Sequence, residues 1–314
     1  MDTVAVVMEG PQRLNLSRIE LAPPADEEVV VDIEHSGIST GTERLFWSGR
    51  MPQFPGMGYP LVPGYESVGR VTAAGSACHN RLGDWVFVPG ARCFGAVRGL
   101  FGGAASRLVV PSSRATLIDE SIGERGVLLA LAATAYHAIC ARDCARPDLI
   151  VGHGVLGQLL ARLALQLGRD APTVWEIDPL RAALSSPGYQ VIHPDADDRR
   201  DYRAIYDVSG DSSLLDKLIG RLGHGGQLVL AGFYGESLSF SFPPAFMREA
   251  RIRIAAQWHQ SDLEQVKAMV ETGELSLDGL ITHRHEAQAA AAAYAQAFSD
   301  PGCLKMILDW RGCA

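Results

Sequence analysis

The chain has 314 residues, of which 47% are hydrophobic and 20% charged, and its formal net charge is -8. This length suits two domains with a crevice between them, and the composition is that of a globular protein rather than a disordered or fibrous one. The sequence is acidic overall and has no basic run interleaved with aromatic residues, which argues against nucleic acid as a partner.

The sequence also bears on the compartment of the protein. It contains no apolar stretch of about 18 residues, so we expect no membrane-spanning helix. The first residues lack a basic segment followed by a long apolar one, which favours a cytoplasmic protein. The six cysteines are scattered along the chain. A chain of this length needs no disulfide staples, so we expect reduced thiols.

Short β-branched runs separated by Gly and Pro predict a β-rich domain over residues 1–122. Between Gly41 and Gly64 this pattern gives way to a long loop rich in aromatic, Met and Pro residues, and loops of that length usually have a function. A wall for a flat substrate and a small satellite core under the loop explain these side chains equally well. The candidate substrate-binding residues are Trp47, Phe54, Met57 and Tyr59.

An Ala-rich helical stretch begins near Glu124, and alternating strands and helices follow it. This pattern predicts an α/β fold with a doubly wound parallel sheet over residues 123–261. Residues 262–314 contain two helical segments and a closing strand, and we expect this tail to rejoin the first domain. The last strand of the sheet, RIRIAAQ, would leave an edge of unpaired backbone groups, so a homodimer that covers this edge is expected.

A glycine turn follows the predicted strand LIV and precedes an amphipathic helix. Its first Gly permits a tight turn, its second lets the backbone approach a pyrophosphate, and its third lets helix and strand pack closely. The helix start supplies N–H groups for the anion. The strand before and the helix after make this a specific dinucleotide signal, carried by Gly152, Gly154, Val155, Leu156 and Gly157.

The acid of this motif is predicted to be Asp178, which lies 21 residues beyond Gly157 and would bind the adenosine ribose, favouring NAD over NADP. In the alternative interpretation Asp178 only caps the helix that begins at Pro179. Arg181 could instead bind a phosphate, although an exposed arginine explains it as well. Two later strand ends are predicted to face the nicotinamide half, Ser209-Gly210 and Gly232-Phe233.

The order of these segments resembles the medium-chain dehydrogenase/reductase superfamily over nearly the whole chain. The phrases SGISTGTE, VPGYESVGRV, GDWVFVPG, GGAASRLVV and LGHGGQLVLAGF resemble its landmarks in their expected order. The resemblance implies a GroES-like catalytic domain and a Rossmann domain. Among zinc-free members, the chain resembles the dehydrogenases of bacteriochlorophyll biosynthesis. That resemblance implies oxidation of the hydroxyethyl group of a bacteriochlorophyllide, a chlorin, to an acetyl group, with NAD as the hydride acceptor.

The metal-ligand phrases of zinc-containing members are absent from this sequence. Where they have a Cys phrase and a Gly-His-Glu phrase, this chain has Thr40-Gly41-Thr42-Glu43 and Gly64-Tyr65-Glu66. Only Glu66 remains of the usual ligand set, and a catalytic zinc site requires three protein ligands. We therefore expect no metal.

Without zinc, side chains must handle the hydroxyl proton. Thr42 stands where the family has a relay hydroxyl and Tyr65 where a metal-ligating His would be, so a Thr42–Tyr65 relay is the leading hypothesis. Glu66 could be a base with a raised pKa if it is buried without a metal, or it could pair with an Arg and hold the loop, and the structural role is favoured. His137 is a further candidate base, although a lone His is more often structural.

Two other functions remain open. A zinc-free quinone or enone reductase would use the same cofactor fold, and a non-catalytic dinucleotide-binding sensor would bind the cofactor without turnover.

Overall fold

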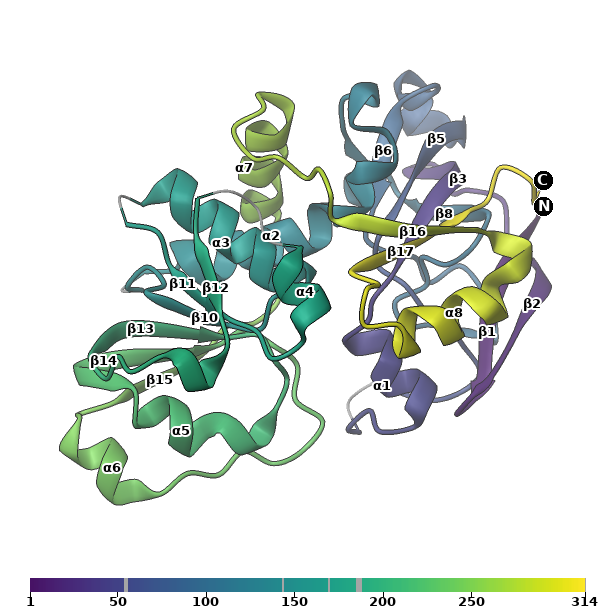
Figure 1. Cartoon of the computed structure of the whole chain (residues 1–314). Coiled ribbons are helices and arrows are strands. Elements are labelled where there is room, and N and C mark those ends of the chain that lie inside the picture. The colour runs from purple at the N-terminus through teal and green to yellow at the C-terminus, as the bar shows by residue number, and fades with distance from the viewer. Residues whose placement is uncertain (54–55, 143, 169, 185–187, 314) are drawn as a thin grey trace. The chain divides into compact units, whose positions relative to one another are not determined.

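The computed structural model describes residues 1–53, 56–142, 144–168, 170–184 and 188–313 (Figure 1). The chain divides into two compact units. The first unit comprises Met1–Ala130 and Leu277–Ala314, and the second comprises Leu131–Ser276. The predicted α/β class, with a β-rich part and a doubly wound parallel sheet, is confirmed.

The first unit is built from two sheets, with strand orders β2-β1-β4-β7 and β16-β17-β3-β5-β6-β9, and β8 also pairs with β3. Two helices accompany them, α1 (Thr42–Ser48) and α8 (Ala290–Ser299). The strands are β1 (Asp2–Gly10), β2 (Arg13–Glu20), β3 (Glu28–Ile38), β4 (Leu61–Val62), β5 (Ser67–Ala74), β6 (Trp85–Val88), β7 (Arg98–Gly99), β8 (Arg107–Pro111), β9 (Thr116–Leu117), β16 (Ile281–Glu286) and β17 (Lys305–Asp309).

The C-terminal segment rejoins the first unit through strand pairing. β17 runs antiparallel to β3, with Met306 opposite Ile38. Helix α8 turns its small side chains inward, since Ala290, Ala293 and Ala297 are all buried. The Ala-rich run is therefore a tightly packed helix that covers part of the core.

The second unit contains one parallel sheet with the strand order β12-β11-β10-β13-β14-β15. The chain starts in the middle at β10, moves outward, and then crosses back to β13, which creates a topological switch point beside β10. The elements are α2 (Leu129–Cys140), β10 (Leu149–Val151), α3 (Val155–Leu167), β11 (Thr173–Trp175), α4 (Pro179–Ala183), β12 (Gln190–Ile192), β13 (Tyr202–Asp207), α5 (Leu215–Ile219), β14 (Leu222–Leu230), α6 (Phe242–Met247), β15 (Arg251–Ile254) and α7 (Gln260–Glu271).

The boundaries of the units differ from those that the sequence predicts, 122/123 and 261/262. Helix α7 was expected to open the returning tail, but it belongs to the second unit. Asp262 in its first turn accepts a hydrogen bond from His137 at 2.8 Å, and Arg162 donates to the Ser276 carbonyl at 2.7 Å. These bonds join α7 and the segment after it to α2 and α3.

The predicted long loop between Gly41 and Gly64 is partly regular, since it contains α1 and β4. Gly49 ends α1 in the left-handed conformation, with φ 70°. A glycine in that conformation commonly ends a helix, and Gly49 lies within the aromatic run that the sequence pattern predicts as loop.

No helix in the described ranges is both long enough and apolar enough to cross a bilayer.

Candidate functional site

Three glycines occupy the turn after β10, and the structural requirement for glycine differs among them. Gly152 has a φ of 102°, which favours glycine. A Cβ on Gly157 would lie 2.0 Å from the Gly152 carbonyl oxygen, so only glycine fits there. Gly154 has an ordinary φ of -74°, and a Cβ on it would meet no atom within 4 Å. The fold therefore does not require glycine at this position, whereas a ligand that approaches the backbone would.

The start of α3 presents backbone donors beside Gly154. Gln158 N–H makes the first bond of the helix, to the Gly154 carbonyl at 2.9 Å, and Gly154 provides no side-chain cap. The N–H groups of Val155, Leu156 and Gly157 precede this bond, where an α-helix offers no internal acceptor. Together with the helix dipole, they suit a phosphate group.

Two other predicted loops meet this turn at the carboxyl ends of the strands. A Cβ on Gly152 would lie 3.4 Å from the Ser209 backbone, and one on Gly210 would lie 3.2 Å from the Phe233 carbonyl oxygen. A Cβ on Gly232 would lie 3.3 Å from the Gly210 nitrogen. The structure thus brings together the glycine turn and the loops after β13 and β14.

Asp178 follows β11 and caps α4. Its Oδ1 accepts the N–H groups of Leu180 at 2.9 Å and of Arg181 at 3.1 Å. The Oδ1 atom therefore caps α4, as the alternative interpretation proposes. Ribose binding through Oδ2 stays a prediction. The Arg181 carbonyl accepts a hydrogen bond from His153, so the backbone of this residue joins α4 to the glycine turn.

Glu176 was not selected from the sequence, although it is the first acid after β11 and lies 19 residues beyond Gly157. Its Oε2 accepts the N–H of His153 at 2.9 Å, and its Oε1 accepts the N–H groups of Ile177 and Asp178. This buried carboxylate connects the glycine turn to the end of the next strand. Its position directly after the strand was the signal that could have identified it.

In the first unit, the end of β3 and the start of α1 meet the segment before β5. The Tyr65 hydroxyl donates to Ser39 Oγ at 2.7 Å and also bonds the Thr42 side chain. Burial, and after it the neighbouring Glu66, raise the pKa of Tyr65, so this phenol keeps its proton. Thr42 and Tyr65, which the sequence proposed as partners, are in contact.

Glu66 is completely buried and paired with a cation. Its Oε2 lies 2.6 Å from Lys305 Nζ, and both side chains are at most 1% exposed. Lys305 also donates to the Ile38 carbonyl at 3.3 Å. Burial raises the pKa of Glu66, and Lys305 opposes that shift. Among the described residues, its Oε1 has no hydrogen-bond partner. Glu66 is therefore paired, as its structural role predicts, but its partner is Lys305 and not an Arg.

A second buried carboxyl group, Glu43, was not selected from the sequence. It accepts the Ser39 N–H at 2.9 Å and the Tyr294 hydroxyl at 2.6 Å. Burial raises the pKa of Glu43 to about 7. Glu43 therefore fastens the Ser39 turn to helix α8.

The loop residues proposed for substrate lie partly against the core of the first unit. Trp47, Met57 and Tyr59 are half-buried and pack on that core, and the Trp47 ring lies 6.2 Å from the ring of Phe298. Packing thus accounts for part of each side chain, and a substrate wall stays a prediction. Phe54 lies outside the described residues.

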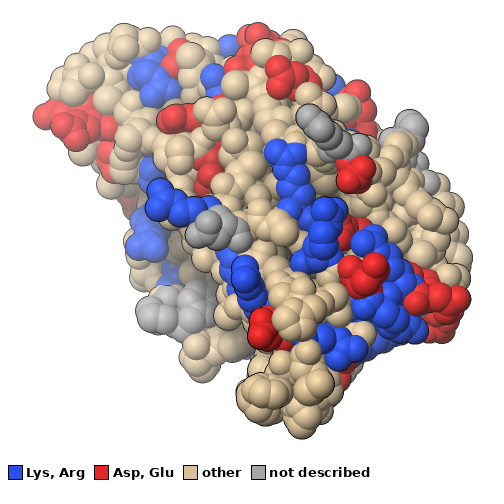
Figure 2. Space-filling view, turned by 90° about the vertical axis from the view of Figure 1, so that its left-hand side faces the viewer, with Lys and Arg blue, Asp and Glu red and all other residues tan. Residues whose placement is uncertain are grey.

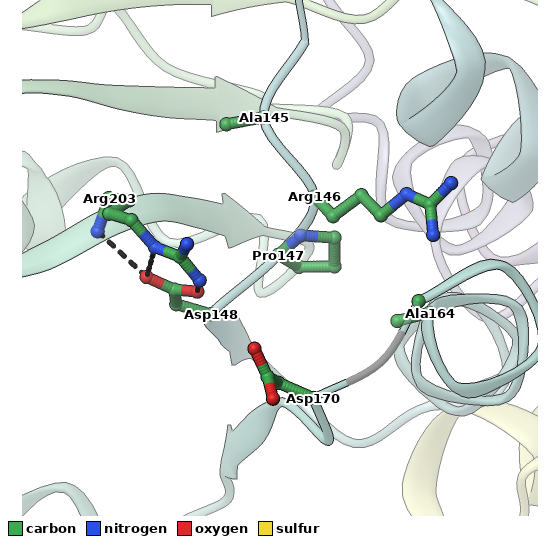
Figure 3. Close-up of a pocket in the computed structure, with 8 residues that line it drawn as sticks. Ala145, Arg146, Pro147, Asp148, Ala164, Asp170 and Arg203 are labelled. Carbon is green, nitrogen blue, oxygen red and sulfur yellow. Dashed lines mark hydrogen bonds and ion pairs between the residues drawn. The ribbon is translucent and has the colours of Figure 1, made fainter.

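A hollow of about 310 Å³ lies in the second unit, lined by Arg146, Asp148, Asp170 and Arg203 among others (Figure 3). Asp148 directly precedes β10, so the hollow lies at the amino ends of the strands, whereas the glycine turn lies at the carboxyl ends. Arg203 already pairs with Asp148 at 2.6 Å. We therefore do not assign the cofactor to this hollow.

Acidic and basic side chains are interspersed over the face of the molecule that Figure 2 shows.

Within the described ranges, no three or more His, Cys, Asp or Glu side chains are grouped to hold a metal ion. The described residues include all six cysteines, and no disulfide joins any of them.

Comparisons with known proteins place this geometry in context. Residues 25–120 match the alcohol dehydrogenase GroES-like domain family. The chain is 58% identical, over 99% of both chains, to the 2-desacetyl-2-hydroxyethyl bacteriochlorophyllide A dehydrogenase of Rhodobacter capsulatus. It is 56% identical, over 100% of both chains, to the protein of that name from Cereibacter sphaeroides. An alcohol dehydrogenase from Escherichia coli complexed with NADH has a similar fold, with a TM-score of 0.83 at 20% identity over 98% of this chain and 99% of that one.

The raised pKa of Glu43 predicts a stability change with pH. The folded protein holds this proton to about pH 7, against 4.5 for the ordinary carboxyl group. The resulting stabilisation is complete below pH 4.5 and is lost as the pH rises through 7, a change of about 3 kcal/mol in the free energy of unfolding. Denaturant unfolding at several pH values should show this loss in the natural protein and not in Glu43→Gln. The variant Glu27→Gln, at an exposed site, should still show the loss. If the free energy of unfolding changes equally with pH in all three proteins, Glu43 is not the group responsible.

Proposed function

This chain belongs to the bacteriochlorophyllide a dehydrogenases of the medium-chain dehydrogenase/reductase superfamily, and we propose that it oxidises the hydroxyethyl side chain of a bacteriochlorophyllide to an acetyl group with NAD. The observation that carries the proposal is the full-length identity of 58% to a relative named for that substrate. The site geometry supports it, because open space at Gly154 lies beside helix N–H groups that would suit a pyrophosphate, and because the Thr42 and Tyr65 side chains are hydrogen-bonded.

The second unit fits a dinucleotide. The open space at Gly154 and the N–H groups at the start of α3 would take the pyrophosphate, and the loops at Ser209 and Gly232 would face the nicotinamide half. When bound, the cofactor supplies an acceptor for hydride. Glu176 and Asp178 place two carboxyl groups after β11, where a 2′-phosphate would be repelled, so NAD is favoured over NADP.

The donor set of the first unit does not fit a catalytic zinc ion. Ser39, Thr42 and Tyr65 supply hydroxyl groups rather than the Cys and His ligands that zinc prefers. Of the two buried carboxyl groups, Glu66 is paired with the Lys305 ammonium group at 2.6 Å, and Glu43 accepts the Tyr294 hydroxyl. We therefore propose that no zinc takes part, and that side chains orient the alcohol and manage its proton.

Tyr65 would act as a hydrogen-bond donor in this scheme when a substrate oxygen replaces Ser39 Oγ as the acceptor of its single phenol proton. Its raised pKa keeps the phenol protonated, so it suits the orientation of a substrate oxygen and not the removal of a proton. Thr42 and Ser39 hold the phenol in place through hydrogen bonds to its oxygen and from it. The half-buried Trp47, Met57 and Tyr59 offer polarizable surface to a flat macrocycle.

We also propose a homodimer that pairs through β15. This strand ends the strand order of its sheet, so one side of its backbone is available to another chain. Its side chain Ile254 is 74% exposed, and Phe242, Phe246 and Met247 of the preceding helix are exposed as well. Exposed apolar surface next to an open edge favours a second copy that covers both.

Incubation with NAD and a hydroxyethyl chlorin tests the function. We expect the absorbance to shift as the acetyl product forms, and Tyr65→Phe to lower kcat by about 100-fold because an oriented donor is lost. The matched control is Tyr202→Phe, which also removes a buried hydroxyl donor, to Asp197 at 2.6 Å, and should keep kcat. No shift with folded protein would remove this substrate. Reduction of enone double bonds with NADPH would instead select the reductase.

Substitution in the glycine turn tests the cofactor site. Gly154→Val should weaken NAD binding by at least about tenfold, or 1.4 kcal/mol, because its side chain would fill the pyrophosphate space, where an added Cβ meets no protein atom within 4 Å. Gly157→Ala should lower the melting temperature, because its Cβ would lie 2.0 Å from a backbone oxygen. Unchanged NAD binding in Gly154→Val would show that the dinucleotide lies elsewhere.

The edge of the sheet can be tested by light scattering after gel filtration. Ile254→Asp should give a monomer, because a charge would be buried in the paired edge. Ile177→Asp, at an Ile that is 73% exposed away from β15, should remain a dimer. A monomeric natural protein, or a dimer that survives Ile254→Asp, would contradict the proposal.

A further inference from the structure

An exposed arginine lies against the aromatic loop of the first unit. Arg98, in β7, donates through Nη1 to the Tyr59 carbonyl at 3.1 Å. A Cβ on Gly58 would lie 3.2 Å from Cζ of Arg98, so the guanidinium group lies directly against the backbone between Met57 and Tyr59. The side chains of Met57 and Tyr59 are half-buried and pack on the core. A positive charge therefore lies beside the apolar surface that a flat substrate would use.

The charge of Arg98 is not neutralised by a carboxylate of the protein. Other arginines of the first unit are paired, as Arg107 is with Asp32 at 2.5 Å. In the part of the chain that the structure describes, the Arg98 side chain makes no ion pair, and its hydrogen bond is the one to the Tyr59 carbonyl. A guanidinium group carries five N–H donors in a planar fork, so most of the fork of Arg98 can bind an anion from solution.

Two parallel segments connect Arg98 with the phenol of Tyr65. β4 and β7 pair in parallel, with Leu61 opposite Arg98. The chain runs on from β4 to Tyr65 and from β7 to Phe101, and these two rings stand edge-on with centroids 5.4 Å apart. Phe101 lies three positions after Arg98, so at most about 11 Å of chain separates them. A tetrapyrrole with its side chains spans a comparable distance.

We propose that Arg98 binds the propionate carboxylate of the bacteriochlorophyllide; the proposal rests on the dehydrogenase function above. A bacteriochlorophyllide is the free acid of its pigment, and the propionate is on the ring next to the one that carries the hydroxyethyl group. A guanidinium group can hold a carboxylate through two parallel N–H donors. With the macrocycle against Met57 and Tyr59, the carboxylate meets Arg98 and the hydroxyethyl group points along the two segments toward Tyr65.

This assignment makes Arg98 a residue that determines specificity. All the side chains that it uses belong to the first unit. An ester of the propionate carries no charge, and its oxygen atoms accept weaker hydrogen bonds from a guanidinium group than a carboxylate does. The site therefore selects the free acid over esterified pigment. An arginine that only fastened β7 to the loop, through the Tyr59 carbonyl, would not distinguish the two.

Kinetics with the acid and its methyl ester test the proposal. In the natural protein, kcat/KM for the hydroxyethyl bacteriochlorophyllide should exceed that for its methyl ester by at least about tenfold, because the ester lacks the charged acceptor. Arg98→Gln should raise KM for the acid by about that factor, leave kcat and the values for the ester nearly unchanged, and so abolish the preference. The matched control Arg114→Gln removes another exposed arginine of the first unit, which donates to the Pro89 carbonyl at 3.2 Å, and should keep the preference.

Equilibrium binding separates this proposal from the proposed reaction. Pheophorbide a, a chlorin with a free propionate and no hydroxyethyl group, and its methyl ester can be titrated against the protein by absorbance without NAD. The natural protein and Arg114→Gln should bind the acid at least about tenfold more tightly than the ester. Arg98→Gln should bind both equally, and so should Arg98→Met, which keeps the length of the side chain and removes its charge.

The outcomes are distinct. No binding, or equal binding of acid and ester by the natural protein, would overturn the assignment of Arg98. A preference for the acid that survives in either folded Arg98 variant would overturn it as well. If the preference depends on Arg98 but no hydroxyethyl chlorin is oxidised with NAD, the proposed reaction fails and the carboxylate site stands.

Discussion

The first unit depends on a buried ion pair that joins distant parts of the chain. Lys305 opens β17 at the end of the sequence, and Glu66 directly precedes β5, and both strands pair with β3. Their contact at 2.6 Å fixes the place where β3 ends and α1 begins. Removing one partner would leave an uncompensated buried charge, which typically costs about 3–5 kcal/mol. The hydroxyl groups of Ser39, Thr42 and Tyr65 can hold one geometry because this frame is rigid.

Burial sets the protonation of several polar groups in the first unit. Burial raises the pKa of Tyr65 and Tyr294 and of the carboxyl group of Glu43, so the first unit holds protons firmly. In the second unit, Nδ1 of His137 lies 2.8 Å from Oδ2 of Asp262.

The proposed cofactor site shows which features local sequence can predict and which it cannot. The glycine turn was predicted from the sequence, since a strand, a turn with fixed glycine spacing and a helix are adjacent in the chain. The acid after β11 was harder to identify from the sequence, because Glu176 and Asp178 both lie at a suitable distance from the glycine turn. Hydrogen bonds separate them: Glu176 holds the glycine turn and Asp178 caps α4. Backbone geometry decides which of the two acids takes which role, and residue type alone does not distinguish them.

The sequence by itself determined the α/β class, the parallel sheet with β15 at its edge, and the contact candidates Thr42 and Tyr65, because each rests on periodicity, short-range spacing or family phrases. Only the tertiary structure decided that Glu66 pairs with Lys305, 239 positions away, that Tyr294 bonds Glu43, and that His137 meets Asp262. These partners are separated by long stretches of chain, and no local pattern specifies which buried charge or polar group will meet which. Strand pairing and helix packing bring them together, and burial then sets their protonation.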